Sequence, residues 1–136
     1  MRYNQWMTDP KLLQLTASEP LTLEEEYAMQ ESWCNDPKKC TFIILAKKTF
    51  QAIPLNNCND EEIAYMCGDV NLFFNNIDNA GDAEIEIMIA EPDCCGKGIA
   101  TEAVAIMMNY GIKIGVSRFY AKISSSNEAS RRLFQK

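Results

Sequence analysis

Residues 93–100 read Asp93-Cys94-Cys95-Gly96-Lys97-Gly98-Ile99-Ala100, and this turn decides the fold. The apolar run before the turn predicts a strand, and the periodic apolar residues after it predict a helix. Gly96 and Gly98 have no Cβ, so the backbone can bend tightly there. Its N–H groups can then approach an anion at the positive end of the helix. The turn therefore predicts a ligand that carries a pyrophosphate.

The helix after the turn is amphipathic. The residues of its expected inner face, which recur at helical spacing, are Ile99, Ala103, Ile106, Met107 and Tyr110. We expect this face to pack on a sheet and the helix to end near Gly115.

Helices and strands on either side complete the pattern. Asp9 and Pro10 are typical of an N-cap and a first helical residue, and Thr22 with Glu25 forms a capping box before a second helix. That helix should end near 35–37. Strands are predicted at 41–45, 63–74 (bent at Gly68), 83–89 and 119–123, and polar, turn-like segments at 54–61 and 75–81. With Asn127 as the N-cap of a last helix, the order ααβββαβα predicts one α+β domain over residues 1–136.

Composition restricts the class of protein. The chain has 136 residues with 13 basic and 19 acidic side chains, and a net charge of −6. This charge repels DNA and RNA and favours a cationic substrate, such as an amine or a basic peptide end. No apolar run is long enough to span a membrane, and the N-terminus lacks a signal-peptide pattern. We expect a cytoplasmic or nuclear protein with no nucleic-acid partner and no membrane partner.

The chain has six cysteines and no histidine. Because their spacing is irregular and secretory features are lacking, we expect reduced thiols rather than disulfides. Adjacent Cys94 and Cys95 are poorly arranged to share a tetrahedral site, so no metal is expected.

Two motifs, in order along the chain, resemble those of the GNAT superfamily of N-acetyltransferases. The first, Cys95-x-x-Gly98-x-Ala100, resembles the acetyl-coenzyme A motif Q/R-x-x-G-x-G/A. The second, Asn127-Glu128-Ala129-Ser130-Arg131-Arg132-Leu133-Phe134-Gln135-Lys136, resembles Asn-x-x-Ser/Ala-x-x-Leu-Tyr/Phe-x-Lys. The segments 15–22 (LTASEPLT), 68–73 (GDVNLF) and 88–92 (MIAEP) are similar to the N-acetyltransferase 9-like branch.

The resemblance implies a GNAT-like mixed, mostly antiparallel sheet flanked by helices. The family's first and last strands are not recognised, so the chain reads as truncated at both ends. Acetyl-coenzyme A is the implied cosubstrate, and its pyrophosphate would lie on the N–H groups of Gly96, Lys97, Gly98, Ile99 and Ala100. Cys95 stands where the family has Arg or Gln, which removes a charge-assisted phosphate contact.

The resemblance also implies contacts for the rest of the cofactor. Its pantetheine would run along Met88 and Ile89 as a pseudo-strand. Asn127 and Ser130 would contact the pantetheine or phosphate region. The alternative for these two residues is ordinary helix capping and a surface hydroxyl.

The family's general base is a glutamate at the start of the strand before the turn, where this chain has Glu84. Glu86 shares its face, because strand side chains alternate. Two close carboxylates raise each other's pKa, and either could take a proton from a substrate ammonium. We expect Glu84 as the base, with Glu86 helping to hold the substrate; the alternative is a solvated acidic strand face. Phe134 replaces the tyrosine that is the acid in many relatives, so the general acid is unassigned.

The implied function is that of an acyltransferase. It would move acetyl from acetyl-coenzyme A to the N-terminal α-amine of a protein, by direct attack in a ternary complex, with tubulin chains as the implied targets. The rival hypothesis is a regulatory protein that binds coenzyme A weakly and catalyses nothing. The replacements at Cys95 and Phe134 favour this rival.

Overall fold

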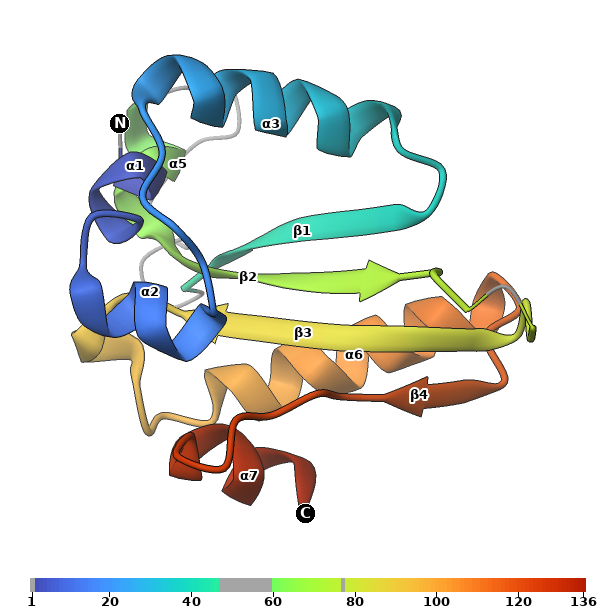
Figure 1. Cartoon of the computed structure of the whole chain (residues 1–136). Helices are drawn as coiled ribbons and strands as arrows, with labels where there is room; N and C mark the ends of the chain where they lie inside the picture. The colour runs from blue at the N-terminus through green and yellow to red at the C-terminus, as the bar shows by residue number, and fades with distance from the viewer. Residues whose placement is uncertain (1, 47–59, 77) are drawn as a thin grey trace.

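The computed structural model describes residues 2–46, 60–76 and 78–136. Its sheet has four strands in the order β1 (Lys39–Leu45), β2 (Met66–Phe73), β3 (Asp82–Ile89) and β4 (Arg118–Tyr120). The first three strands pair antiparallel, whereas β4 runs parallel to β3 (Figure 1). The predicted mixed, mostly antiparallel sheet of an α+β fold is confirmed.

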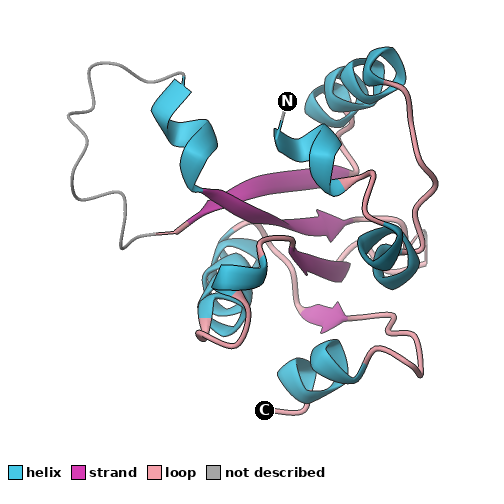
Figure 2. Ribbon diagram, turned by 90° about the vertical axis from the view of Figure 1, so that its left-hand side faces the viewer, coloured by secondary structure: helices cyan, strands magenta, loops and turns pink. Residues whose placement is uncertain are grey.

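Helices cover both faces of this sheet. On one face lie α1 (Arg2–Trp6), α2 (Pro10–Thr16) and α3 (Leu23–Asn35), and α6 (Ile99–Lys113) packs against β2 and β3 from the other (Figure 2). After β4 the chain leads to α7 (Glu128–Phe134). None of the helices in the described ranges is long and apolar enough to cross a membrane.

The predicted capping residues are confirmed. The Asp9 carboxylate accepts a hydrogen bond from the first turn of α2 at 2.8 Å. At the start of α3, Glu25 N donates to Thr22 Oγ1 at 3.3 Å and Thr22 N donates to Glu25 Oε2 at 2.8 Å, which completes the capping box. Asn127 Oδ1 accepts from Ser130 N at 3.1 Å and so caps α7.

Alternation along β3 assigns its side chains to the two faces of the sheet. Ala83 and Ile85 face α6 and pack with Met107 in the larger buried core. Met88 packs with Trp6 of α1 in a second, smaller core on the opposite face. The even-numbered residues of β3, including both glutamates, therefore lie on the side of α1, α2 and α3.

The inner face of α6 differs from the prediction. Val104, Met107 and Gly111 are buried against the sheet, whereas Ile106 and Tyr110 are 62% and 38% exposed. At Gly111 an aromatic ring from β4 lies so close that an added Cβ would meet it at 2.7 Å. Because Gly111 has no side chain, the face of α6 that contains it can approach the sheet. The helix ends near Gly115, as predicted.

Three further differences concern element bounds. The strand predicted at 63–74 begins only at Met66, because the preceding residues form α5 (Asp60–Tyr65). Strand β4 is three residues long, shorter than the predicted 119–123. Neither α1 nor α5 is predicted, since helices of five and six residues are too short to show a period. Most of the polar segment predicted at 54–61 lies outside the described residues.

Gly68 lies where β2 approaches β3 closely. A Cβ at this position would lie 1.9 Å from the carbonyl oxygen of Met88. The β1–β2 ladder is also irregular here, because Ile44 pairs with Gly68 but Leu45 pairs with Met66. The bend expected at this glycine is therefore a bulge beside it, and the glycine itself is required by the neighbouring backbone.

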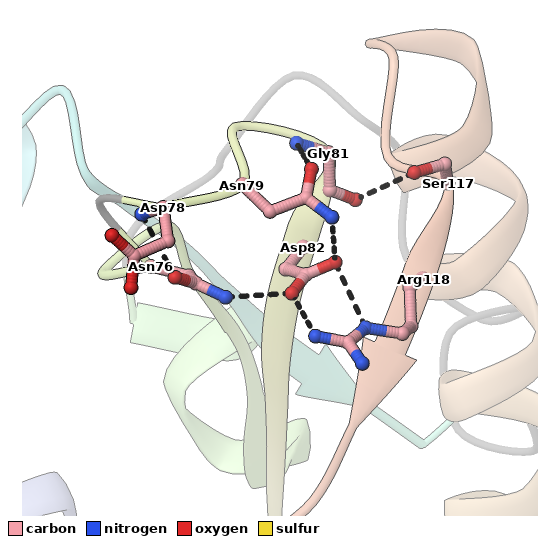
Figure 3. Close-up of polar contacts among 7 residues, drawn as sticks. All are labelled: Asn76, Asp78, Asn79, Gly81, Asp82, Ser117 and Arg118. Atoms are coloured by element: carbon pink, nitrogen blue, oxygen red, sulfur yellow. Dashed lines mark hydrogen bonds and ion pairs between the residues drawn. The ribbon is translucent and has the colours of Figure 1, made fainter.

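The carboxylate of Asp82 connects β4 to the start of β3 through hydrogen bonds (Figure 3). Its carboxylate is 1% exposed and accepts hydrogen bonds from Asn76 Nδ2 at 2.6 Å, Asn79 Nδ2 at 3.0 Å and Arg118 Nε at 2.9 Å. The Arg118 guanidinium also forms an ion pair with it and holds the pKa of Asp82 below its usual value. This network joins the turn before β3 to the parallel edge strand.

Candidate active site

The glycine turn connects β3 to α6 through the short 3₁₀ helix η1 (Pro92–Cys94). Gly96 and Gly98 have φ angles of +71° and +83°, a region that residues with a Cβ rarely adopt. Gly98 is the N-cap of α6, so the N–H groups of the first helical turn have no acceptor within the helix. A Cβ at either glycine would meet nothing within 4 Å, so this backbone borders open space.

A cleft of about 800 Å³ opens in front of this turn. We call it the turn cleft, and its wall is formed by the glycine turn, the end of β3, α2 and α7. Three basic residues, Lys11, Arg132 and Lys136, lie on its wall. Asp9 and Glu128 line it as well, and Glu128 forms an ion pair with Arg132. In a chain of net charge −6, the small excess of positive charge that remains fits an anionic ligand.

The turn cleft lies where β3 and β4 part. Strand β4 pairs with β3 only over Asp82, Ala83 and Glu84. Within the described ranges, no strand pairs with this edge of β3 beyond Glu84. The later residues Met88 and Ile89 line the cleft, where an extended ligand with amide groups could pair with the strand.

A second cleft, of about 530 Å³, lies on the side of the sheet that faces α1, α2 and α3. We call it the acidic cleft, because Asp69, Glu84 and Glu86 line it. These carboxylates come from the neighbouring strands β2 and β3. Such a grouping attracts a cationic ligand.

The two glutamates differ in their partners. Glu84 is 5% exposed, and its Oε2 accepts a hydrogen bond from Lys122 Nζ at 2.7 Å. For the side chain of Glu86, the described part of the chain provides no hydrogen bond or ion pair. Two causes raise the pKa of Glu86 above its usual value: partial burial, which is the larger, and the charge of the neighbouring Glu84 carboxylate. Glu86 is therefore the carboxylate with capacity to accept a proton from a ligand.

Asp69 lies at the floor of the acidic cleft, where Tyr3 Oη donates a hydrogen bond to its Oδ2 at 2.8 Å. Asp69 is 4% exposed, and burial raises its pKa although the Tyr3 bond opposes the change. Burial and the Asp69 carboxylate also raise the pKa of Tyr3. The pair is a buried, internally satisfied part of the cleft wall.

Lys39 lines the same cleft from β1. Its Nζ lies 3.6 Å from the centroid of the Trp33 ring and 4.8 Å from that of Phe73, both within cation–π range. Burial lowers the pKa of Lys39, although the carboxylates of Asp69 and Glu86 oppose this change.

The two clefts meet. Six residues line both of them: Leu15, Thr16, Ile87, Met88, Asn127 and Ser130. A ligand held at the glycine turn can therefore extend along β3 toward the carboxylates without crossing the sheet.

Most predicted site residues line one of these clefts. Glu84 and Glu86 line the acidic cleft, and Met88, Asn127 and Ser130 line both. The turn cleft alone is lined by Ile89, Cys95, Gly96, Gly98, Ile99 and Ala100. Lys97 is exposed and lines neither cleft. The structure thus brings together the two motifs and the two glutamates, which lie far apart in the sequence.

Sequence reasoning missed four residues of the acidic cleft, namely Tyr3, Trp33, Lys39 and Asp69. The one local signal was the pair Asp69 and Asn71, two polar residues at alternate positions of an otherwise apolar strand. The other three come from α1, α3 and β1, and no sequence spacing relates them.

Cys95 is exposed, and its Sγ lies 3.5 Å from the carbonyl oxygen of Glu91. It therefore presents a thiol at the position where the resembled motif has Arg or Gln. Among the described residues, the cysteines are all free, and burial raises the pKa of Cys67 to about 11. No group of three or more potential metal ligands occurs in that part of the chain.

Comparison with known proteins gives a consistent result. Residues 1–136 match the family model described as acetyltransferase (GNAT) domain. The chain is 54% identical over 136 residues to the N-acetyltransferase 9-like protein of Nematostella vectensis, covering 99% of this chain and 66% of that protein. It is 52% identical to alpha/beta-tubulin-N-acetyltransferase 9 of Homo sapiens, covering 99% and 64%. The chain thus spans just under two thirds of the length of these relatives.

Solved structures share the fold. Spermidine N-acetyltransferase from Vibrio cholerae in complex with CoA and spermine superposes with a TM-score of 0.74 at 19% identity, over 98% of this chain and 70% of that one. Aminoglycoside acetyltransferase AAC(6')-Ib in complex with coenzyme A gives a TM-score of 0.72 at 13% identity, over 98% and 73%.

Proposed function

Because the chain belongs to the GNAT acetyltransferase domain family, we propose that it transfers an acetyl group from acetyl-coenzyme A to the N-terminal α-amine of a protein. The substrate proposed is tubulin, which is named in the description of the human relative. One observation carries the proposal: the glycine turn and a group of carboxylates line two clefts that meet along β3.

The turn cleft fits coenzyme A. The open space before Gly96 and Gly98, with the free N–H groups of the first turn of α6, suits the pyrophosphate. Lys97 is proposed to contribute only its backbone N–H. The unpaired edge at Met88 and Ile89 suits the amide groups of pantetheine. Asn127 and Ser130 lie where the clefts meet, so they would border the pantetheine although Asn127 also caps α7.

The acidic cleft fits the substrate amine. We assign the general base to Glu86, because Glu84 already forms an ion pair with Lys122 and because the pKa of Glu86 is raised. Glu84 then has a supporting role, since its charge raises the pKa of Glu86 and holds Lys122 at the cleft. The role of base, expected from the sequence for Glu84, is thus proposed for Glu86.

The proposed reaction is direct transfer in a ternary complex. Acetyl-coenzyme A supplies an acetyl thioester when bound. Glu86, directly or through one water, takes the proton of the substrate ammonium, and the free amine attacks the thioester carbonyl carbon. A C–N bond forms, the C–S bond breaks, and the nitrogen loses its second proton to solvent. The sulfur leaves as a thiolate that water can protonate. Phe134 lines the acidic cleft but has no proton to give.

The cost of deprotonation favours an α-amine over a lysine side chain. At pH 7 an α-amine with a pKa near 8 costs about 1.4 kcal/mol to deprotonate, whereas a lysine amine near 10.4 costs roughly 4.6 kcal/mol. A site with one available carboxylate and no identified acid is better suited to the easier amine.

The test is a thiol-release assay with acetyl-coenzyme A and the N-terminal peptide of a tubulin chain. The control peptide has the same sequence with a blocked α-amine and an internal lysine. We expect thiol release with the free α-amine and at least about tenfold less with the blocked peptide. Equal rates for the two peptides would reject the α-amine as the acceptor.

A second candidate function is binding of coenzyme A without turnover, which the replacement of Arg or Gln by Cys95 favours. Titration calorimetry with coenzyme A separates the two candidates. Binding together with no thiol release for any peptide would support this second function and contradict the first.

A further inference from the structure

Lys39 occupies the row of side chains that leads to the proposed catalytic glutamates. It pairs with Phe73 in the β1–β2 ladder, and Phe73 pairs with Glu84 in the β2–β3 ladder. Directly paired residues share a face of the sheet, so Lys39, Phe73 and Glu84 point to the same side. All three line the acidic cleft.

The ammonium of Lys39 lies in surroundings that would suit a substrate ammonium. Aromatic rings of Trp33 and Phe73 lie 3.6 and 4.8 Å from its Nζ. The carboxylates of Asp69, Glu86 and Asp36 act on it through space. Among the described residues Lys39 forms no ion pair, and its amine contacts ring faces instead.

We propose that Lys39 is a self-acetylation site, at which the protein modifies its own side chain from acetyl-coenzyme A. The inference rests on the proposed function, because the same cofactor and the same base are used. It assigns a modification to a residue that would otherwise serve only as part of the cleft wall.

The step balances as the peptide reaction does. The Lys39 ammonium loses one proton to Glu86, directly or through one water, and the neutral Nζ attacks the thioester carbonyl carbon. An amide C–N bond forms and the C–S bond breaks. The amine loses its second proton to solvent, and coenzyme A leaves as the thiol or thiolate. No oxidant or further reactant is required.

Two neighbouring lysines serve as controls. Lys122 lines the same cleft, but its ion pair with Glu84 raises its pKa and so favours the protonated form of its amine. Lys38 is the adjacent residue in the chain, is exposed and lines neither cleft. Burial lowers the pKa of Lys39. Selective modification of Lys39 would therefore follow from its position and environment.

The experiment is mass spectrometry of the 136-residue chain after incubation with acetyl-coenzyme A alone, with fragment ions that separate Lys38 from Lys39. We expect acetylation of Lys39 at least roughly tenfold faster than of Lys38 or Lys122, because attack within a bound complex has a high effective concentration. The Lys39→Arg variant should lose this added mass, whereas Lys38→Arg should keep it. Equal or faster modification of Lys38 or Lys122 would overturn the inference.

A Glu86→Gln variant separates enzymatic from chemical acetylation. Removing the carboxylate takes away a charge that favours the ammonium form of Lys39. Simple chemical acetylation would then stay the same or become faster, whereas the proposed reaction should become at least about tenfold slower. An unchanged or faster rate in the variant contradicts the inference.

Adding the tubulin N-terminal peptide to the same reaction distinguishes the two proposals. Peptide acetylation with unmodified Lys39 overturns the inference and leaves the proposed function in place. Acetylation of Lys39 without acetylation of the peptide supports the inference and rejects that peptide as the substrate. If neither is modified, both proposals fail.

Discussion

At the scale of single residues, the pKa of Glu86 depends on the charge of Glu84. Both side chains line the acidic cleft, but only Glu84 has a cation at hydrogen-bond distance, Lys122 Nζ at 2.7 Å. The negative charge that remains on Glu84 contributes to the raised pKa of Glu86. Mutating each glutamate should therefore affect the pH–rate profile in a different way.

The Glu86→Gln variant should lose the acidic limb of the kcat/KM profile, and its rate should fall about a hundredfold, because the amide cannot accept the proton. The Glu84→Gln variant should keep the limb but shift it to lower pH, because one cause of the raised pKa of Glu86 is removed. Steady-state rates between pH 5 and 9 would measure both effects.

The matched control is Glu31→Gln, an exposed change on α3 away from both clefts, which should leave the profile unaltered. Loss of the limb in Glu84→Gln, with its retention in Glu86→Gln, would assign the base to Glu84 instead.

Cys95 is exposed beside the proposed phosphate site. A Cys95→Arg variant should bind acetyl-coenzyme A about ten- to a hundredfold more tightly, because a hydrogen bond to a charged group contributes about 1.5–3 kcal/mol. Titration calorimetry measures the affinity, with Cys95→Ser as the uncharged control. The same affinity in Cys95→Arg and Cys95→Ser would show that this position does not reach the phosphates.

Residues of the turn and residues of the acidic cleft differ in how far the sequence could predict them. Gly96 and Gly98 are required by local φ angles, and a local motif reports such a requirement. Lys39 and Asp69 gain their roles from Trp33, Phe73 and Tyr3, which other elements bring near. No local pattern encodes those contacts, so the acidic cleft was predicted only through the β3 glutamates.

At the scale of elements, Gly68 sets the distance between β2 and β3. A Gly68→Ala variant should be destabilised by about 3 kcal/mol, because its Cβ would lie 1.9 Å from the main-chain oxygen of Met88. Gly115→Ala is the comparison, since that site has open space and only its φ of +102° is unfavourable, which costs about 1–2 kcal/mol. Urea denaturation measures both changes, and a smaller loss for Gly68→Ala would contradict this account.

Helices that begin at a capping residue were predicted well, whereas elements defined by packing were predicted less well. The starts of α2 and α3 follow from Asp9 and from Thr22 with Glu25, whose hydrogen bonds are local. The buried face of α6 was predicted only in part: Met107 is buried as expected, but Gly111 admits a ring from β4, and Val104 is buried instead of Ile106 and Tyr110. Periodicity cannot register a partner from another element.

At the scale of the whole molecule, pH should act on stability through two sets of carboxylates whose effects on the free energy of unfolding are opposite. Asp82 has a lowered pKa, so its contribution is complete above the unfolded pKa near 4 and is lost as the pH falls through the lower folded value. Asp69 and Glu86 have raised pKa values, so they favour folding more as the pH falls toward their unfolded values. Stability should therefore be greatest at mildly acidic pH.

The Asp82→Asn variant tests this balance. Its folding should be weaker than that of the parent at pH 7, and its denaturation midpoint should fall less steeply below about pH 4, because the titrating group is gone. Urea midpoints from pH 2 to 7 measure the difference. A variant whose midpoints run parallel to those of the parent throughout would show that the carboxylate shared by Asn76, Asn79 and Arg118 does not control acid unfolding.

The parting of β3 and β4 also bears on how the protein behaves in storage. Beyond Glu84, no strand in the described ranges pairs with the β4-facing edge of β3, and an unpaired strand edge is a template for joining another chain. A bound pantetheine would cover this edge, so coenzyme A should also protect the protein against aggregation. Light scattering at rising concentration should therefore show slower aggregate growth when coenzyme A is added.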